Sequence, residues 1–122
     1  MVKIVIIDDE VQILNMLETF LKRMEGYSVE TFSNPVAGLN HVLSSDIDVV
    51  LLDIMMPQMD GIEVLNKIKE RKPNVKIIMM TAYSTLDRVL QTHKKGADSY
   101  LMKPFESLSV LQSKIKEVLE NN

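Results

Sequence analysis

Val49-Val50-Leu51-Leu52-Asp53 is the stretch that decides the fold of this 122-residue chain. Four consecutive apolar residues are typical of a strand buried on both faces, as in a parallel sheet. The run ends on a carboxylate, which would lie at the rim of such a sheet, where ligands bind in open α/β folds. We therefore predict that Asp53 is the reactive centre of the protein.

The composition fits one domain and excludes several classes of function. Hydrophobic residues make up 46% of the chain, enough for a sizeable core. The net charge of −3 gives no basic footprint for nucleic acid, and the absence of cysteine excludes disulfides and thiolate chemistry. Asp8-Asp9-Glu10 interrupts the first apolar run, and no run approaches the length of a membrane span, so we expect a cytoplasmic protein.

Strand-like and helix-like segments alternate along the sequence. Besides the run at 49–53, strands are predicted at 4–7, 28–32, 75–80 and 99–102. Helices are predicted between them and after the last strand, the weakest over 85–95. This alternation predicts a parallel sheet with helices on both faces.

The first predicted helix follows Asp8-Asp9-Glu10, acids that are suited to capping a helix. Its predicted buried stripe has helical spacing and comprises Ile13, Met16, Leu17, Phe20 and Met24. Val11 and Leu14 fall off this stripe.

Polar residues stand where four predicted strands end: Asp8 and Asp9, Asp53, Thr81, and Lys103. The carboxyl ends of parallel strands share one edge of the sheet, so these side chains can converge. Clustered carboxylates resist joint ionisation, and a divalent cation removes that conflict. Oxygen ligands without His or Cys suit Mg²⁺ or Mn²⁺ rather than zinc.

This constellation fits phosphoryl chemistry. Asp53 could act as a nucleophile toward phosphorus and form an aspartyl-phosphate. The metal and the Lys103 ammonium would neutralise charge on the phosphoryl oxygens, and the Thr81 hydroxyl could donate a hydrogen bond to one of them.

From Lys3 to about Glu120 the chain resembles the receiver domain of bacterial two-component response regulators, most closely the chemotaxis and sporulation-relay type of single domain. Four motifs in order carry the resemblance: Ile7-Asp8-Asp9-Glu10, Leu52-Asp53-Ile54-Met55-Met56-Pro57 with Met59-Asp60-Gly61, Met80-Thr81-Ala82-Tyr83, and Lys103-Pro104-Phe105. The resemblance implies one receiver domain over 1–122, with a flavodoxin-like, doubly wound, five-stranded parallel sheet of order 2-1-3-4-5 and five helices.

The resemblance also implies a function. Asp53 would accept a phosphoryl group from a phosphohistidine on a sensor histidine kinase or histidine phosphotransfer protein. The domain would be a signalling switch that catalyses only its own phosphorylation and dephosphorylation. Asp9, Asp53 and the backbone carbonyl of Met55 would bind Mg²⁺ directly, Mn²⁺ would substitute for it, and Asp8 would act through a metal-bound water.

In the switch that the resemblance implies, Lys103 contacts the phosphoryl group, Thr81 moves toward it and Tyr100 swings inward. The surface of the fourth helix, fifth strand and fifth helix would change, and through it a phosphorylation-dependent dimer could form. No nucleic acid or membrane is expected to bind this domain directly. The bulky Met55 and Tyr83 are expected to slow hydrolysis of the phosphoryl group.

Four residues are expected to dock the helical bundle of a kinase: Val11, Leu14, Pro104 and Phe105. Singly, the site residues also have ordinary structural explanations, such as helix capping for Asp8-Asp9 and packing for Tyr100. A haloacid-dehalogenase-type phosphatase would need an acid two residues after the nucleophile, where this chain has Met55. A pseudo-receiver would have a broken pocket, and a flavin carrier would need a Ser/Thr/Gly-rich loop after the first strand.

Overall fold

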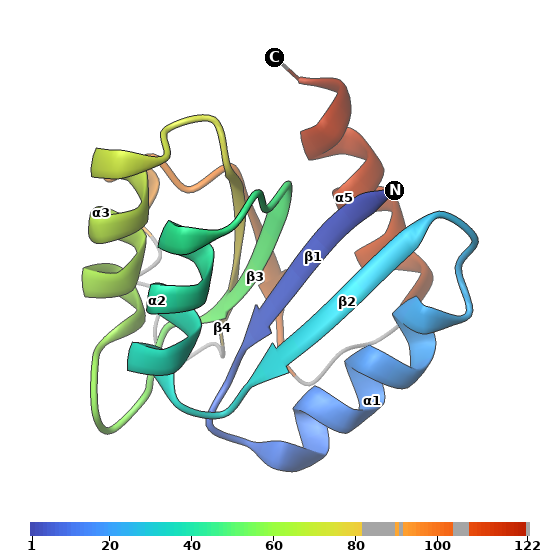
Figure 1. The fold of residues 1–122 in the computed structure, drawn as a ribbon, viewed down its shortest axis with the longest axis horizontal. Helices are drawn as coiled ribbons and strands as arrows, with labels where there is room; N and C mark the ends of the chain where they lie inside the picture. Colours follow the sequence, from blue (N-terminus) through green and yellow to red (C-terminus); the bar gives the residue numbers. More distant parts are fainter. Residues whose placement is uncertain (82–89, 91, 104–107, 122) are drawn as a thin grey trace.

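The computed structural model describes residues 1–81, 90, 92–103 and 108–121. Strands and helices follow one another along the chain as β1 (Val2–Ile7), α1 (Val11–Lys22), β2 (Tyr27–Phe32), α2 (Pro35–Ser44), β3 (Val49–Asp53), α3 (Gly61–Arg71), β4 (Lys76–Thr81), β5 (Ser99–Met102) and α5 (Leu108–Glu120) (Figure 1). The five predicted strands are confirmed. The helix predicted over 85–95 lies largely outside the described residues, although 90 and 92–94 are helical.

The strands form one parallel sheet of order β2-β1-β3-β4-β5, as predicted. β3 lies at its centre, with Val50 opposite Val5 of β1 and Ile77 of β4. All five residues of β3 are buried, because helices cover both faces of the sheet. The uninterrupted apolar run of β3 is therefore the sequence pattern of a central strand.

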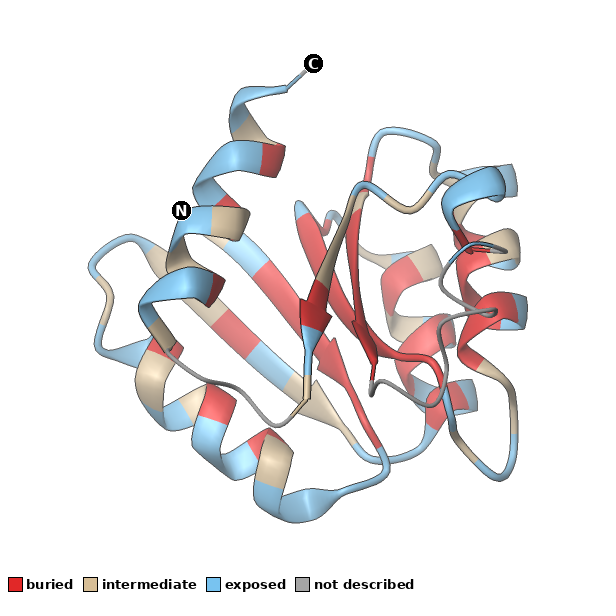
Figure 2. Ribbon diagram, turned by 180° about the vertical axis from the view of Figure 1, so that it is seen from behind, coloured by how far each residue is buried: buried red, intermediate tan, exposed pale blue. Residues whose placement is uncertain are grey.

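Two hydrophobic layers flank the sheet, and successive β3 residues contribute to opposite layers. Val50 and Leu52 pack in the layer under α2 and α3, and Val49 and Leu51 pack in the layer under α1 and α5. Figure 2 shows the same division: the buried residues concentrate on the strands and on the inner sides of the helices. Among the described residues, no helix is long and apolar enough to cross a bilayer.

The α1 helix is rotated relative to the prediction. Its buried residues are Leu14, Leu17 and Leu21, whereas Met16 of the predicted stripe is 38% exposed. Leu14 is only 5% exposed and packs with Ile4 and other core residues, so its predicted place off the stripe is wrong. Both stripes have helical spacing and share Leu17; packing against the sheet selects the leucine stripe.

Side-chain caps fix the starts of α2 and α3. Asn34 Oδ1 accepts hydrogen bonds from the backbone nitrogens of Val36 (2.9 Å) and Ala37 (3.1 Å), and Asp60 Oδ1 accepts one from Ile62 (2.7 Å). At α1 the capping residue is Glu10, but its side chain makes no capping hydrogen bond.

Candidate functional site

The predicted site residues lie at the carboxyl edge of the sheet, toward which the arrowheads in Figure 1 point. Asp8 follows β1, Asp53 ends β3, Thr81 ends β4 and Lys103 follows β5. Asp8, Asp53 and Thr81 are three of the four buried polar or charged residues in the described part of the chain. Burial of such groups is costly unless they have partners, so their convergence marks this edge as the candidate site.

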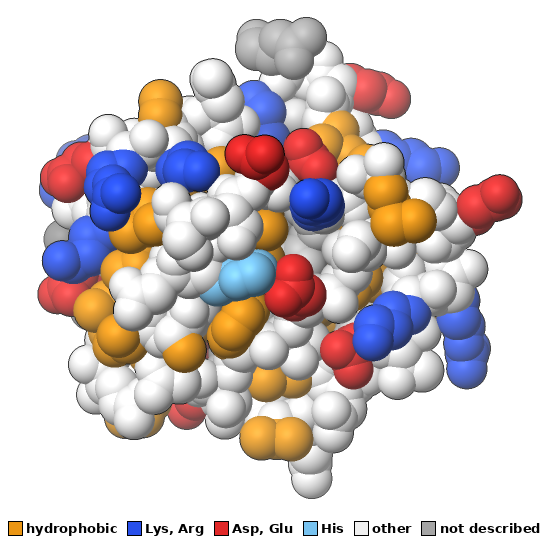
Figure 3. Space-filling model, viewed as in Figure 1, with side chains coloured by type: hydrophobic (Ala, Val, Ile, Leu, Met, Phe, Trp, Pro, Cys, Tyr) orange, Lys and Arg blue, Asp and Glu red, His pale blue; other side chains and the backbone are white. Residues whose placement is uncertain are grey.

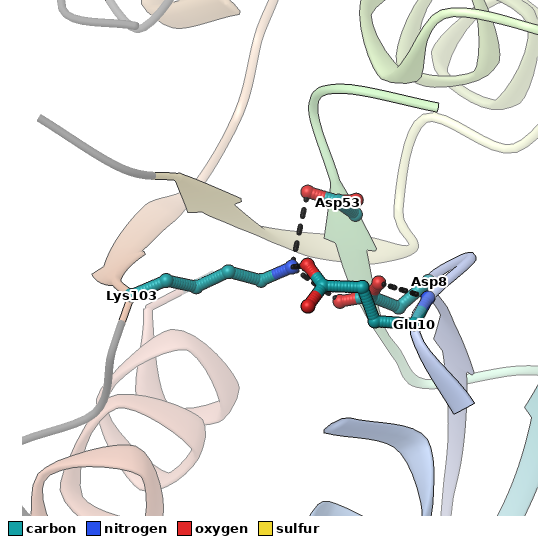
Figure 4. Close-up of polar contacts among 4 residues, drawn as sticks. All are labelled: Asp8, Glu10, Asp53 and Lys103. Carbon is teal, nitrogen blue, oxygen red and sulfur yellow. Dashed lines mark hydrogen bonds and ion pairs between the residues drawn. The ribbon is translucent and has the colours of Figure 1, made fainter. Parts of the chain in front are cut away.

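The Lys103 ammonium joins the carboxylates of this edge (Figure 4). Its Nζ lies 2.6 Å from Asp8 Oδ2, 3.3 Å from Asp53 Oδ1 and 3.3 Å from Glu10 Oε1. Asp8 is fully buried, whereas the Glu10 side chain is 61% exposed and lies at the rim. One cation therefore faces three acids, two inside the protein and one at its surface.

The excess of acid perturbs the ionisation of the site. Burial, then the charge of Asp8, and to a smaller extent a hydrogen bond with Asp9 raise the pKa of Asp53 to about 7, against the opposing effect of Lys103. Burial also raises the pKa of Asp8, although Lys103 works against it. Neither carboxylate is fully stabilised by the ammonium alone, so the pocket favours an additional cation.

The Lys103 ammonium stays charged in this environment. Burial works to lower the pKa of Lys103, but the hydrogen bond to Asp8 and the charges of Asp53, Asp8 and Glu10 outweigh it, so the pKa is raised. The Lys103 backbone is fixed as well, because its N–H donates to the Thr81 carbonyl at 2.6 Å. The end of β4 therefore positions the cation of the site.

Gly61 explains how Asp53 is held. A Cβ atom at Gly61 would lie 2.1 Å from the Asp53 carbonyl oxygen and 2.8 Å from Ile54 Cα, so this position accepts no side chain without displacing the backbone. The Gly61 N–H donates to the Ile54 carbonyl at 2.8 Å, and Ile54 N–H donates to the Met80 carbonyl at 3.2 Å. The first turn of α3 thus packs directly on the residue that would react.

The donor set fits a hard divalent cation. Carboxylate oxygens of Asp8, Glu10 and Asp53 lie within 4.8 Å of one another. Oxygen-only sites of this kind suit Mg²⁺ or Mn²⁺. Sequence reasoning missed Glu10, which it assigned to helix capping; its position two residues after Asp8, at the same strand end, was the available signal. Direct coordination by Asp9 and by the Met55 carbonyl stays a prediction.

The remaining predicted residues separate into three groups. Tyr100 is half-buried and packs against the core, with its ring centroid 6.3 Å from that of His93, and its switch role stays a prediction. Val11 is exposed, whereas the buried Leu14 offers no surface to a partner, so the docking prediction for Leu14 is wrong. Tyr83, Pro104 and Phe105 lie outside the described residues.

Comparison with known proteins identifies the family. The sequence model of the family described as 'Response regulator receiver domain' matches residues 4–116 of this chain. Sporulation initiation phosphotransferase F of Bacillus subtilis is 35% identical over 117 residues, which cover 96% of this chain and 93% of that protein. The transcriptional regulatory protein ZraR of Klebsiella oxytoca is 37% identical over 118 residues, covering 97% of this chain. The chain spans only 26% of ZraR and 45% of the B. subtilis regulator ResD.

Solved structures agree with this assignment. A response regulator receiver domain protein from Clostridium thermocellum superimposes with a TM-score of 0.89 at 33% identity, covering 98% of this chain and 94% of that one. A CheY-like receiver domain protein from Methanospirillum hungatei gives a TM-score of 0.87 at 32% identity, covering 100% and 99% of the two chains. The chain belongs to the response regulator receiver domain family.

Proposed function

We propose that this receiver domain is a phosphorylation-activated switch in which Asp53 accepts a phosphoryl group from a phosphohistidine in a Mg²⁺-dependent reaction. The observation that carries the proposal is the Lys103 ammonium, which lies between the buried carboxylates of Asp8 and Asp53 at the carboxyl edge of the sheet. A nucleophile, a fixed cation and an acidic metal pocket are the parts that phosphoryl transfer to a carboxylate requires.

The transfer is a displacement at phosphorus. An Asp53 carboxylate oxygen forms the new O–P bond while the N–P bond of the donor breaks, and its electron pair stays on the histidine nitrogen. Lys103, 3.3 Å from Asp53 Oδ1, can pair with the phosphoryl oxygens. Mg²⁺, held by the acidic pocket, supplies further positive charge at those oxygens when bound.

The switch would use the neighbouring strand ends. Thr81 at the end of β4 can donate its hydroxyl to a phosphoryl oxygen, and Tyr100 on β5 would follow that movement. The phosphoryl group would thereby bias an equilibrium between two conformations of the fourth helix, β5 and α5. This surface would contact a partner or form a phosphorylation-dependent dimer.

The proposed donor is a sensor histidine kinase or a histidine phosphotransfer protein. Similarity over nearly the full length to a protein named as a sporulation phosphotransferase supports a place in a phosphoryl relay. Exposed Val11 at the start of α1 is the described residue that we propose to dock the donor. A phosphatase of the haloacid-dehalogenase type is disfavoured by the family match.

Two further expectations stay predictions: a cytoplasmic location and the absence of direct nucleic-acid binding. On the face shown in Figure 3, basic and acidic side chains are interspersed. This mixture is consistent with the net charge of −3 and supports protein partners over a polyanion.

Phosphorylation by a small donor tests the proposal. The wild type and Asp53→Asn are incubated with Mg²⁺ and acetyl phosphate, and acid-labile phosphate is measured by intact mass before and after acid treatment. The wild type should gain one phosphoryl group and Asp53→Asn none. Asp46→Asn, which removes an exposed acid before β3, is the matched control and should behave as wild type. A wild type that gains no phosphate and binds no beryllofluoride would overturn the proposal.

A further inference from the structure

Glu10 lies in the candidate site, but the proposed phosphoryl transfer assigns no role to its side chain. It stands at the N-cap of α1 without making a capping hydrogen bond. Its Oε1 instead lies 3.3 Å from Lys103 Nζ, although 93 residues separate the two in sequence. Figure 4 shows the Glu10 side chain reaching toward the ammonium alongside Asp8.

Lys103 and a divalent cation compete for the same carboxylates. The ammonium contacts Asp8, Glu10 and Asp53, whose oxygens form the compact group that fits a metal. A cation bound by Asp8 and Asp53 would place like charges a few ångströms apart, which is unfavourable in a partly buried pocket. Metal binding therefore requires the ammonium to leave at least one buried carboxylate.

The Lys103 side chain has little room in which to move away from the buried carboxylates. Its side chain is only 12% exposed, and its backbone N–H is bound to the Thr81 carbonyl. Among its three carboxylate partners, Glu10 is the one at the rim, outside the buried pair. An ammonium that moves toward Glu10 keeps an ion pair while it moves away from the centre of the pocket.

We propose that Glu10 is a positioning residue for Lys103. Its carboxylate would remain paired with the Lys103 ammonium when a divalent cation binds at Asp8 and Asp53. This inference rests on the proposed function and refines its metal step. Glu10 acts through Lys103 and makes displacement of the ammonium less costly, so it raises the affinity of the site for Mg²⁺.

Mg²⁺ binding without a phosphodonor tests the inference, measured by titration calorimetry. Glu10→Gln should weaken Mg²⁺ binding about threefold, the scale of a partly exposed ion pair. Glu18→Gln, which removes an α1 acid paired with Lys22 rather than Lys103, is the control for net charge and should bind Mg²⁺ as wild type does. In phosphorylation by acetyl phosphate, Glu10→Gln should need a higher Mg²⁺ concentration than wild type to reach half of its own maximal rate.

The decisive comparison is made in a Lys103→Met background, with Lys103→Gln as a substitute if that variant does not fold. Lys103→Met should bind Mg²⁺ more tightly than wild type, and adding Glu10→Gln should then have no effect. An equal loss of affinity in both backgrounds would make Glu10 a direct ligand or a simple charge, and would overturn the inference. Wild-type affinity in Glu10→Gln would also overturn it while leaving the proposed function intact. A wild type that neither binds Mg²⁺ nor gains phosphate would overturn both.

Discussion

The two edges of the sheet each hold a lysine bound to an aspartate, but they satisfy these charges differently. At the amino edge, Lys69 Nζ donates to Asp98 Oδ2 at 2.9 Å and to the Val75 carbonyl at 2.8 Å. The same Asp98 oxygen accepts the Ile77 N–H at 2.8 Å. One anion meets one cation there, and backbone groups take the remaining hydrogen bonds.

At the carboxyl edge, one lysine faces Asp8, Glu10 and Asp53. These acids outnumber their cation, and the pKa of Asp53 is raised to about 7. We interpret the balanced cluster as one that ties elements together, and the unbalanced cluster as the site where the proposed ligand would bind.

The largest expected effect comes from breaking the backbone support of the carboxyl edge. Gly61→Ala places a Cβ against the Asp53 carbonyl, so the free energy of unfolding should fall by about 3 kcal/mol. Urea denaturation measures this change, and phosphate uptake by the folded variant should be lost.

Gly38→Ala is the matched control on α2. Its Cβ would meet the Ile7 side chain at 2.7 Å rather than backbone, and a side chain can shift. A smaller loss of stability with normal phosphate uptake is expected. Equal behaviour of the two variants would show that the Gly61 contact does not hold Asp53 in place.

An intermediate loss of stability is expected from removing the Lys69–Asp98 ion pair at the amino edge. Lys69→Met leaves the partly buried Asp98 without its cation, so stability should fall by about 2 kcal/mol. Phosphate uptake at a temperature where the variant is folded should match that of wild type. Lys67→Met, which removes an exposed lysine of the same helix, should change stability little. Loss of phosphate uptake in folded Lys69→Met would mean that the two edges are not independent.

The last expected effect is a pH dependence of stability that comes from Asp53 at the carboxyl edge. The pKa of Asp53 is about 7 in the folded protein against an ordinary 3.8, so between these values the folded state binds more protons than the unfolded state. Stability of the metal-free protein should therefore fall as pH rises from about 4 to 7. Asp53→Asn should lack this destabilising contribution and should therefore be more stable than wild type at pH 8.

Urea denaturation in EDTA at several pH values measures this difference in stability between the two proteins. The difference should shrink toward zero below the ordinary pKa of 3.8, because Asp53 is then protonated in both the folded and the unfolded state. Saturating Mg²⁺ should also reduce it, since a bound cation favours the ionised carboxylate. A gap that is the same at every pH would contradict the raised pKa.

Local sequence patterns predicted the strands and the residues at their ends. The β3 run and the polar residues that follow the strands are short-range signals, and parallel pairing brings those ends to one edge. Two helical stripes on α1 shared Leu17, so spacing alone could not choose between Leu14 and Met16. Packing on β1 and β2 makes that choice, and it is a tertiary interaction.

Two long-range charge pairs, Lys69 with Asp98 and Glu10 with Lys103, were not predictable from the sequence. Lys69 and Asp98 are 29 residues apart, and Glu10 and Lys103 are 93 apart. None of these residues has a local pattern that identifies its partner. The imbalance of charge that distinguishes the two edges follows from such pairs, so it needs the folded structure.

The pairing of Asp8 with Lys103 also constrains how the domain is completed. Asp8 is fully buried, and the lysine that neutralises it stands 95 residues later in the chain. During synthesis from the amino end, the first strand is made long before the residue that compensates its acid. The carboxyl edge can therefore reach its native charge state only after β5 has joined the sheet, which makes this edge a late step in assembly.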